Sequence, residues 1–309
     1  MKSTLFLASL MATPWAMQAD VLHAYARLLA REYGNKLSAG DHRDETPHAD
    51  DGLAVQAAAP RATQRTASGA IAVVPLYGSI MPRANMLEMC GGGTSVETFT
   101  KALRSAMADE TVSQILIDID SPGGSVYGVG ELAAEIRAAR AVKPVIGIAN
   151  HVAASAAYWA GSACSELYVT PGGQVGSIGV IAAHEDMSKM LEAEGVNVTL
   201  ITAGKFKAEG NPYGPLDEEA LRSIQADIDS YYADFTNAVA KGRSVSVEAV
   251  RKDMGQGRML RGDAALANSM VDGVATFDEV VKKMQRNAKS TGNRSALRAA
   301  RNELSLITG

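Results

Sequence analysis

The chain has few of the residues that hold small secreted or metal-dependent proteins together. Only two cysteines occur among its 309 residues, Cys90 and Cys164, and two thiols cannot build a disulfide framework. The five histidines are scattered without metal-ligand spacing, so we expect neither a metal nor another cofactor. The formal net charge of −4 provides no overall attraction to nucleic acid or to an anionic membrane. Disulfide-rich, metal-dependent and nucleic-acid-binding classes are therefore disfavoured.

Long apolar runs are also missing. No stretch approaches the roughly 20 apolar residues that span a bilayer, so no membrane span is expected. Residues 1–12 imitate a secretion signal, with one positive charge and a short apolar stretch, but Pro14 and Trp15 interrupt it early. The cysteine content suits a reducing compartment. We expect a cytoplasmic protein, with secretion as the alternative.

Apolar residues make up 47% of the chain, enough for one core of about 200 residues with appendages. From Ile71 onward, short β-rich runs alternate with longer helical patterns, without an internal repeat. Strands are expected at Ile71–Leu76, Gln114–Ile119, Val145–Ala149, Glu166–Val169, Ser177–Ala182 and Asn197–Ile201. Helices are expected at Ser95–Asp109, Val126–Ala141, Ala154–Ser162, Asp186–Glu194, Asp217–Lys241, Val247–Asp253, Gly262–Asn268 and Phe277–Gln285. Such alternation predicts an α/β fold of parallel β-α-β units, and Thr94 with Glu97 predicts a capping box for the first helix.

Composition divides the chain into four parts. Residues 1–36 form an N-terminal helical extension, with an amphipathic helix over Asp20–Gly34. Residues 37–70 are polar, rich in alanine and punctuated by proline, which predicts a flexible linker or arm. Residues 71–285 form a single catalytic domain. Residues 286–309 form a basic tail, more typical of a solvated helix than of a DNA site.

A serine and a lysine are the candidate catalytic pair. Ser155 lies in a run of small residues just after the apolar run Pro144–Ala149, which predicts a strand-to-helix junction. Such a turn exposes a nucleophile, and the first amides of the helix favour negative charge. A lysine activates a serine when desolvation or neighbouring charge makes the amine neutral. Lys207 and Lys205 both lie in a later segment, and either they or Ser155 could instead be ordinary surface and packing residues.

A glycine pair follows an apolar strand. Gly123 and Gly124 come directly after residues 115–122, which end in Asp-Ser-Pro. Glycines let backbone amides converge on a developing oxyanion, although Pro-Gly-Gly is also common turn chemistry. His151 is a rival base, since histidine titrates near neutrality, but the sequence places no carboxylate to orient it.

These segments, in this order, resemble the signal peptide peptidase A family of serine peptidases, which uses a Ser/Lys dyad on a fold related to ClpP and crotonase. Residues 204–213, Gly-Lys-Phe-Lys-Ala-Glu-Gly-Asn-Pro-Tyr, are most similar to the branch found in tailed phages, the lambda-like capsid-assembly (prohead) proteases. The resemblance covers about Ile71 to Val274 and continues weakly into residues 13–33. It implies a ClpP/crotonase-like fold for the catalytic domain.

The resemblance also implies roles for individual residues. Ser155 would be the nucleophile, and Lys207 the base, because Phe206 precedes it and Pro-Tyr follows at 212–213. The oxyanion amides would come from Gly124, aided by Gly123, and from Ala156. Many family members have Gly-Gly after the serine, and this chain has Ala-Ala, which retains the needed amide.

Ser177 lies in another family block, residues 176–180. Its hydroxyl would orient the lysine amine, or else the block is only a tight crossing of backbone. The resemblance leaves both alternatives open.

The function implied is a serine endopeptidase that works through an acyl-enzyme. The phage branch implies head maturation, in which scaffold, capsid and portal proteins are cut inside the procapsid in the host cytoplasm. A homo-oligomer is expected, in which either a neighbouring protomer supplies the lysine or the dyad forms within one chain. The alternatives are a bacterial signal-peptide or quality-control peptidase of the same family, a crotonase-type acyl-CoA enzyme, and a non-catalytic capsid component.

Overall fold

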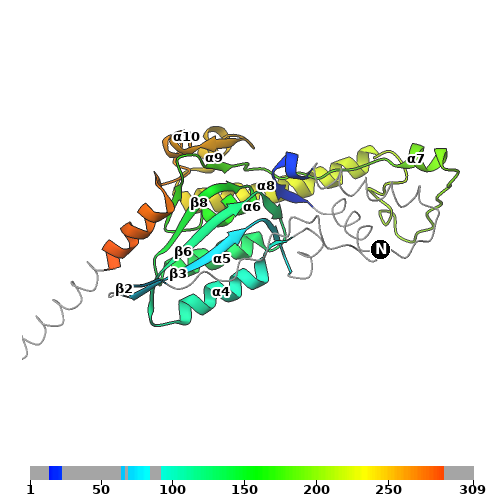
Figure 1. Ribbon diagram of the computed structural model, residues 1–309. Coiled ribbons are helices and arrows are strands. Elements are labelled where there is room, and N and C mark those ends of the chain that lie inside the picture. Colours follow the sequence, from blue (N-terminus) through cyan, green and yellow to red (C-terminus); the bar gives the residue numbers. More distant parts are fainter. Residues whose placement is uncertain (1–13, 23–63, 67–68, 84–91, 289–309) are drawn as a thin grey trace, which may run out of the picture.

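A computed structural model describes residues 14–22, 64–66, 69–83 and 92–288 (Figure 1). Its centre is a mostly parallel sheet in the order β11-β10-β8-β6-β3-β2, with β9 beside β8 and β12 beside β9. The long strands are β3 (Gly69–Tyr77), β6 (Val112–Ser121) and β8 (Val145–Ala154), and all three are parallel. Helices α4 (Val96–Ala108) and α5 (Val129–Arg140) connect them. The predicted α/β class with parallel β-α-β units is confirmed.

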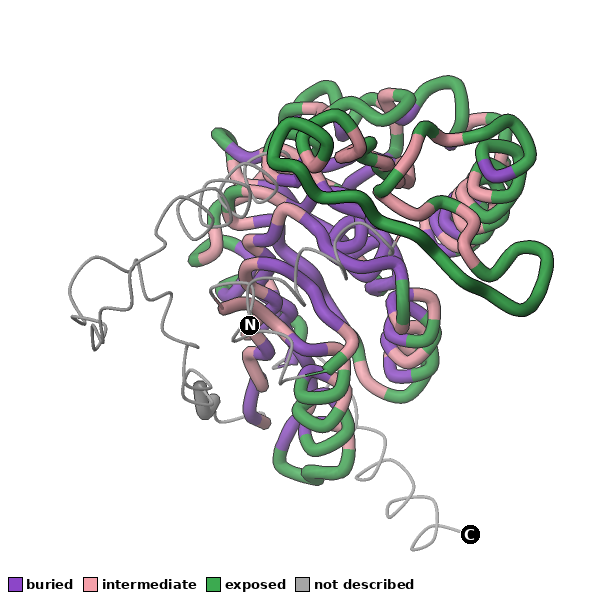
Figure 2. The backbone as a smooth tube through the Cα atoms, turned by 90° about the vertical axis from the view of Figure 1, so that its right-hand side faces the viewer, coloured by how far each residue is buried: buried purple, intermediate pink, exposed green. Residues whose placement is uncertain are grey.

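Alternation along β6 explains how the sheet is buried on both faces. Ile115, Ile117 and Ile119 belong to the large core that includes α4 and α5, whereas Leu116 belongs to a second cluster on the other face. A helix described from Phe277 through Ala288 covers that second face. Because side chains of a strand point alternately to opposite faces, an almost continuous apolar run is what a doubly covered strand requires. Figure 2 shows the buried segments gathered between the exposed outer helices.

Further strands and helices complete the fold. They are β4 (Ser79–Met81), β5 (Gly93–Ser95), β7 (Gly123–Ser125), α6 (Ala156–Gly161), β9 (Glu166–Val169), β10 (Gln174–Gly176), α7 (Ser188–Ala193), α8 (Glu218–Arg243), α9 (Val247–Asp253), β11 (Met259–Arg261), α10 (Gly262–Ala267) and β12 (Gly273–Val274). None of the described helices is long and apolar enough to cross a membrane.

Two short strands lie in the parts of the chain that composition assigns to the N-terminal extension and to the arm. Strand β1 (Trp15–Met17) enters a small second sheet in the order β1-β7-β4-β5. Strand β2 (Gln64–Thr66) pairs antiparallel with β3. The prediction of a linker up to residue 70 is therefore wrong at its end, because residues 64–66 use the open edge of β3. Most of the predicted arm lies outside the described residues, as do most of the predicted N-terminal helix and the basic tail beyond Ala288.

Helix α6 packs against α8 and against the backbone at Met270. Trp159 stacks on Phe235 of α8, with ring centroids 4.7 Å apart and planes at 8°. A Cβ on Gly242 would lie 2.3 Å from the carbonyl oxygen of Ser162, so glycine is needed here for α8 to pack this closely against the end of α6. Tyr158 donates from its hydroxyl to the carbonyl of Met270 at 3.0 Å. These contacts give α6 a rigid support.

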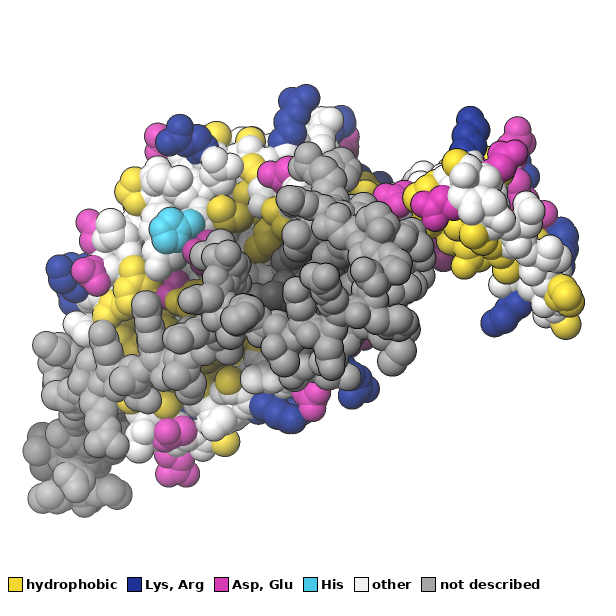
Figure 3. Space-filling view, turned by 45° about the vertical axis from the view of Figure 1, so that its right-hand side comes forward, with side chains coloured by type: hydrophobic (Ala, Val, Ile, Leu, Met, Phe, Trp, Pro, Cys, Tyr) yellow, Lys and Arg dark blue, Asp and Glu magenta, His cyan; other side chains and the backbone are white. Residues whose placement is uncertain are grey.

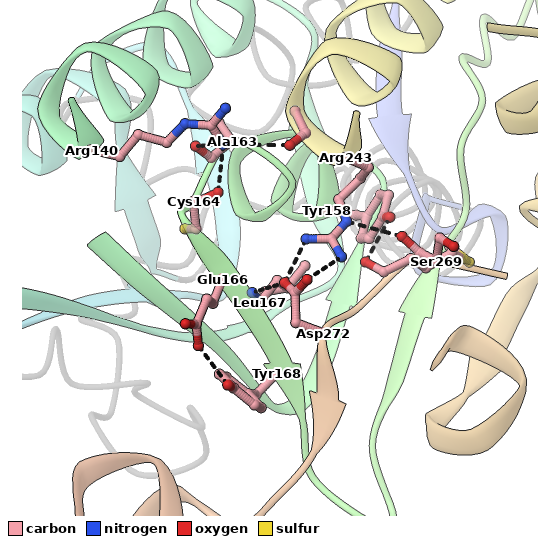
Figure 4. Close-up of polar contacts among 12 residues, drawn as sticks. Arg140, Tyr158, Ala163, Cys164, Glu166, Leu167, Tyr168, Arg243, Ser269 and Asp272 are labelled. Atoms are coloured by element: carbon pink, nitrogen blue, oxygen red, sulfur yellow. Dashed lines mark hydrogen bonds and ion pairs between the residues drawn. The ribbon is translucent and has the colours of Figure 1, made fainter. Parts of the chain in front are cut away.

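An ion pair at the end of α8 extends this support (Figure 4). Arg243 donates to both carboxylate oxygens of Asp272 at 2.7 and 3.0 Å, and the amide of Leu167 donates to the same carboxylate at 2.7 Å. Burial raises the pKa of Asp272, but the hydrogen bonds from Arg243 and Leu167 outweigh it, and the net pKa is lowered. The folded state therefore favours the ionised carboxylate.

Replacing Asp272 by asparagine is expected to lower the free energy of unfolding at pH 7 by about 1–2 kcal/mol, because the Arg243 side chain, 6% exposed, loses its partner. The wild-type contribution is complete above the unfolded pKa, near 4, and disappears as the pH falls through the lower folded value. Denaturant unfolding from pH 7 to 3 should thus show a difference that shrinks below about pH 4. Glu110→Gln, on an exposed residue, is the control, and a difference independent of pH would contradict the assignment.

The segment from residue 183 to 216, which we call the projecting segment, extends away from the sheet and contains α7 (Figure 1). None of its residues is buried. Two strand predictions, one for this segment and one for the residues just before it, were wrong. Ser177–Ala182 forms no strand beyond a single bridge at Ile181, and Asn197–Ile201 is exposed and irregular. Both runs have β-forming residues but no sheet edge beside them for a continuous ladder.

The start of α4 also differs by one residue from the prediction. Ser95, not Thr94, is the N-cap, and its hydroxyl accepts from the amide of Thr98 at 3.0 Å. Thr94 instead exchanges hydrogen bonds with the backbone of Tyr77.

Candidate active site

Ser155 lies where β8 ends and α6 begins, as its sequence position predicts. Its backbone has φ 53° and ψ −116°, which is strained for a residue with a Cβ. The residue is fully buried, and its amide donates to the carbonyl of Gly176 at 2.7 Å. Strain of this kind costs about 1–3 kcal/mol and persists where the surroundings enforce it, often at functional sites. A strained serine at a strand-to-helix turn is typical of a nucleophile.

The serine hydroxyl faces the segment after β10. Its Oγ is 3.4 Å from the carbonyl oxygen of Gly179, a long and weak hydrogen bond. Gly179 also lines a hollow of about 360 Å³ together with residues of α8 and α9. The segment from Gly179 to Ile181 thus begins in contact with Ser155, and we call it the first wall.

Strand β7, with the glycine pair, forms the opposite wall. Gly123 has φ +100°, and a Cβ on it would lie 3.0 Å from the carbonyl oxygen of Ala154, next to the nucleophile. A Cβ on Gly124 would lie 1.9 Å from the carbonyl oxygen of Ile80. Both positions therefore require glycine. The amide of Gly123 donates to Ser121 Oγ at 3.2 Å, which fixes the turn. The fold thus brings the predicted oxyanion glycines beside Ser155 and the first turn of α6, where Ala156 lies.

Lys207 lies outside the buried core that contains Ser155. Ser155 is at the core, whereas Lys207 is exposed in the projecting segment (Figure 1). In the described part of the chain, no ion pair or hydrogen bond holds its ammonium group. Its catalytic role remains a prediction.

Lys205, the competing lysine, already has partners. Its ammonium forms an ion pair with Glu219 at 2.8 Å and lies 4.4 Å from the ring centroid of Phe206. These contacts fit the surface role predicted for Lys205.

Ser177 has φ 53°, and its amide donates to the carbonyl of Arg258 at 2.9 Å. A Cβ on the preceding Gly176 would lie 2.6 Å from that same carbonyl oxygen. The block is therefore a close backbone crossing, as one of the two alternatives predicted. The lysine-orienting role of the hydroxyl remains a prediction.

His151 has a carboxylate partner that the sequence did not reveal. Its Nδ1 is 3.1 Å from Asp120 Oδ2, and the two side chains are 76% and 45% exposed. The two residues are 31 positions apart, at the ends of neighbouring strands β6 and β8. The parallel pairing of those strands was the available signal. No hydrogen bond connects His151 to Ser155 among the described residues.

Known proteins are similar to this chain in sequence. The family model of peptidase family S49 matches residues 137–291, half of the chain, including Ser155 and Lys207. The chain belongs to peptidase family S49. The predicted resemblance to signal peptide peptidase A-like serine peptidases is thereby confirmed.

Curated S49 relatives come from phages and from bacteria. The chain is 31% identical to capsid assembly protease C of Escherichia phage lambda over 72% of this chain and 52% of that protein. It is 33% identical to head-tail preconnector protein GP5 of Enterobacteria phage P21 over 73% and 44%. It is 30% identical to a putative signal peptide peptidase SppA of Enterococcus faecium over 63% and 57%. The chain thus spans about half the length of the curated relatives it matches.

Solved structures similar to this S49 chain include the 1510-N membrane-bound stomatin-specific protease, at 15% identity and TM-score 0.44 over 69% of this chain and 83% of that one. ClpP1 from Listeria monocytogenes has 16% identity and TM-score 0.42 over 66% and 91%. Both TM-scores are below 0.5, so the architecture of the chain is described from its own strand order and register and not from these structures.

Proposed function

We propose that this S49 chain is a serine endopeptidase that cleaves peptide bonds through an acyl-enzyme on Ser155. The observation that supports it best is the strained Ser155 at the end of β8, beside the glycine strand β7. Amides of Gly124 and Ala156 would stabilise the oxyanion of the tetrahedral intermediate. The serine Oγ would attack the carbonyl carbon, and its proton would pass to the base and then to the leaving amine.

We infer that the base is Lys207 of a second copy of the chain. A general-base lysine must be shielded from water so that its amine becomes neutral, and in a single chain Lys207 is exposed. Seven of the eleven exposed large hydrophobic residues of the described chain lie in this segment: Met190, Val196, Val198, Leu200, Ile201, Phe206 and Tyr213. Figure 3 shows hydrophobic side chains gathered on one face of the projecting part. Docking of this face on a neighbouring copy would bury it and carry Lys207 to that copy's Ser155.

The relatives favour a role in virus assembly. Two of them are phage proteins, named a capsid assembly protease and a head-tail preconnector protein. We propose that the substrates are scaffold, capsid and portal polypeptides, cut inside the procapsid in the host cytoplasm. The second candidate is a bacterial signal-peptide or quality-control peptidase, which the similarity to the Enterococcus protein supports.

Incubation of the purified chain with an unfolded protein and with a scaffold protein tests the proposed function. Intact-mass and peptide mass spectrometry should detect new termini, and a fluorophosphonate probe should label Ser155. An acyl-CoA enzyme of the crotonase type would turn over thioesters without labelling at Ser155. A non-catalytic capsid component would give neither cleavage nor labelling, and that result would contradict the proposal.

A further inference from the structure

The strand β1 lies between the two walls that flank Ser155. On one side it pairs antiparallel with β7, the glycine strand. On the other, Trp15 exchanges two backbone hydrogen bonds of 2.8 Å with Ile181. The chain's own residues 14–18 thus join both walls as an extended strand.

The register places Ala16 opposite Gly124. The amide of Gln18 donates to the carbonyl of Pro122 at 3.0 Å, and the amide of Val126 donates to the carbonyl of Pro14 at 3.4 Å. Every second residue pair along an antiparallel ladder is hydrogen-bonded. The Ala16–Gly124 pair lies two residues from each of these bonds, so it is also a bonded pair. The Ala16 carbonyl therefore faces the amide of Gly124, the group assigned to the oxyanion.

The Ala16 carbonyl is also close to the nucleophile's own strand. A Cβ on Gly123 would lie 2.3 Å from the Ala16 oxygen and 3.0 Å from the Ala154 oxygen, so both carbonyls border the same small space. Trp15, Ala16 and Met17 are 2%, 0% and 2% exposed. The strand is therefore buried beside the end of β8, directly before Ser155.

The other edge of strand β7 is not free to pair with a peptide. Its second edge is occupied by β4, which pairs with it at Ile80 and Gly124. A substrate that places its carbonyl on the Gly124 amide would have to take the edge that β1 holds. Peptides that add a strand to a sheet edge bind through these backbone groups.

We propose that residues 14–18 are an internal, substrate-like ligand of the active-site cleft, and that they must leave before a polypeptide substrate binds. This inference rests on the proposed function, since it assigns the cleft to a substrate. The ligand class is an extended peptide with a small residue at the Ala16 position, because that side chain is fully buried. A strand that only completes the fold would stay in place during peptide binding.

A reversible lock tests the inference on the full chain. Trp15→Cys with Ile181→Cys places thiols on directly opposed residues of a bonded pair, whose Cα atoms lie about 5.5 Å apart in such ladders, within disulfide range. Cys90→Ser removes one of the two native cysteines, which leaves Cys164. Burial raises the pKa of Cys164 to about 12, so that thiol does not compete. Intact mass and thiol titration verify the lock.

Binding is measured in a Ser155→Ala background, by fluorescence anisotropy of a labelled Pro-Trp-Ala-Met-Gln peptide. The reduced double variant should bind at least about tenfold more tightly than the oxidised one, because only the reduced form can release residues 14–18. The Trp15→Cys single variant, treated with the same oxidant, should bind in both conditions. A peptide with Lys in place of Ala should not bind.

Equal binding by the oxidised and reduced forms would overturn the inference. Cleavage of an unfolded protein by the Ser155-intact double variant separates this failure from a failure of the proposed function. If the lock blocks peptide binding but the reduced form cleaves nothing, the internal ligand stands and the peptidase proposal falls. If cleavage proceeds equally in the oxidised form, the peptidase proposal stands and the internal ligand falls.

Discussion

Ser155→Ala is expected to lower peptide-bond cleavage by more than about 1,000-fold, because the acyl-enzyme cannot form without the hydroxyl. The variant should fold as well as the wild type. Among the described residues, the side chain of Ser155 loses one weak hydrogen bond, the 3.4 Å contact with the Gly179 carbonyl, and alanine tolerates the backbone no worse than serine does. Turnover is measured by mass spectrometry on an unfolded protein, and folding by thermal unfolding.

Two controls make this result specific. His151→Ala removes the exposed rival base and should retain most of the activity, since no described hydrogen bond connects His151 to Ser155. Ser177→Ala tests the second serine of the site, and a loss confined to turnover would support its lysine-orienting role. Undiminished cleavage by a folded Ser155→Ala protein would remove Ser155 from the mechanism.

The second large effect is recovery of activity when two dead proteins are mixed. Lys207→Ala and Ser155→Ala should each be inactive alone. After subunit exchange, roughly a quarter of the interfaces should pair an intact serine with an intact lysine from the neighbouring copy, if copies mix at random in a closed ring. Recovered activity should therefore approach that fraction of the wild-type value.

The matched control is Lys205→Ala, whose ion pair with Glu219 lies on the surface. It should stay largely active alone. Mass photometry or native mass spectrometry verifies that mixed oligomers have formed. If verified mixed oligomers stay inactive, the lysine and serine act within one chain, and the projecting segment must fold back to bring them together.

The α/β class and the strand-to-helix junction at Ser155, the proposed nucleophile, follow from local sequence patterns. Both features are local sequence patterns. A short, almost continuous apolar run such as Val112–Ser121 is typical of a strand that is covered on both faces, and the small residues around Ser155 mark the turn. The glycine pair proposed for the oxyanion hole could also be located from the sequence, because a glycine pair that closely follows a buried strand lies near the carboxyl end of that strand.

Which distant segments meet depends on the tertiary structure. The three residues of β1 have no period of their own, and their pairing depends on the open edge that β7 presents after β4 has taken the other. The run from Ser177 to Ala182 has strand-like composition, but its hydrogen bonds are divided between Arg258 and Trp15, so no ladder forms. Long-range pairing depends on which backbone groups remain available once the core is packed, and local propensity does not encode that choice.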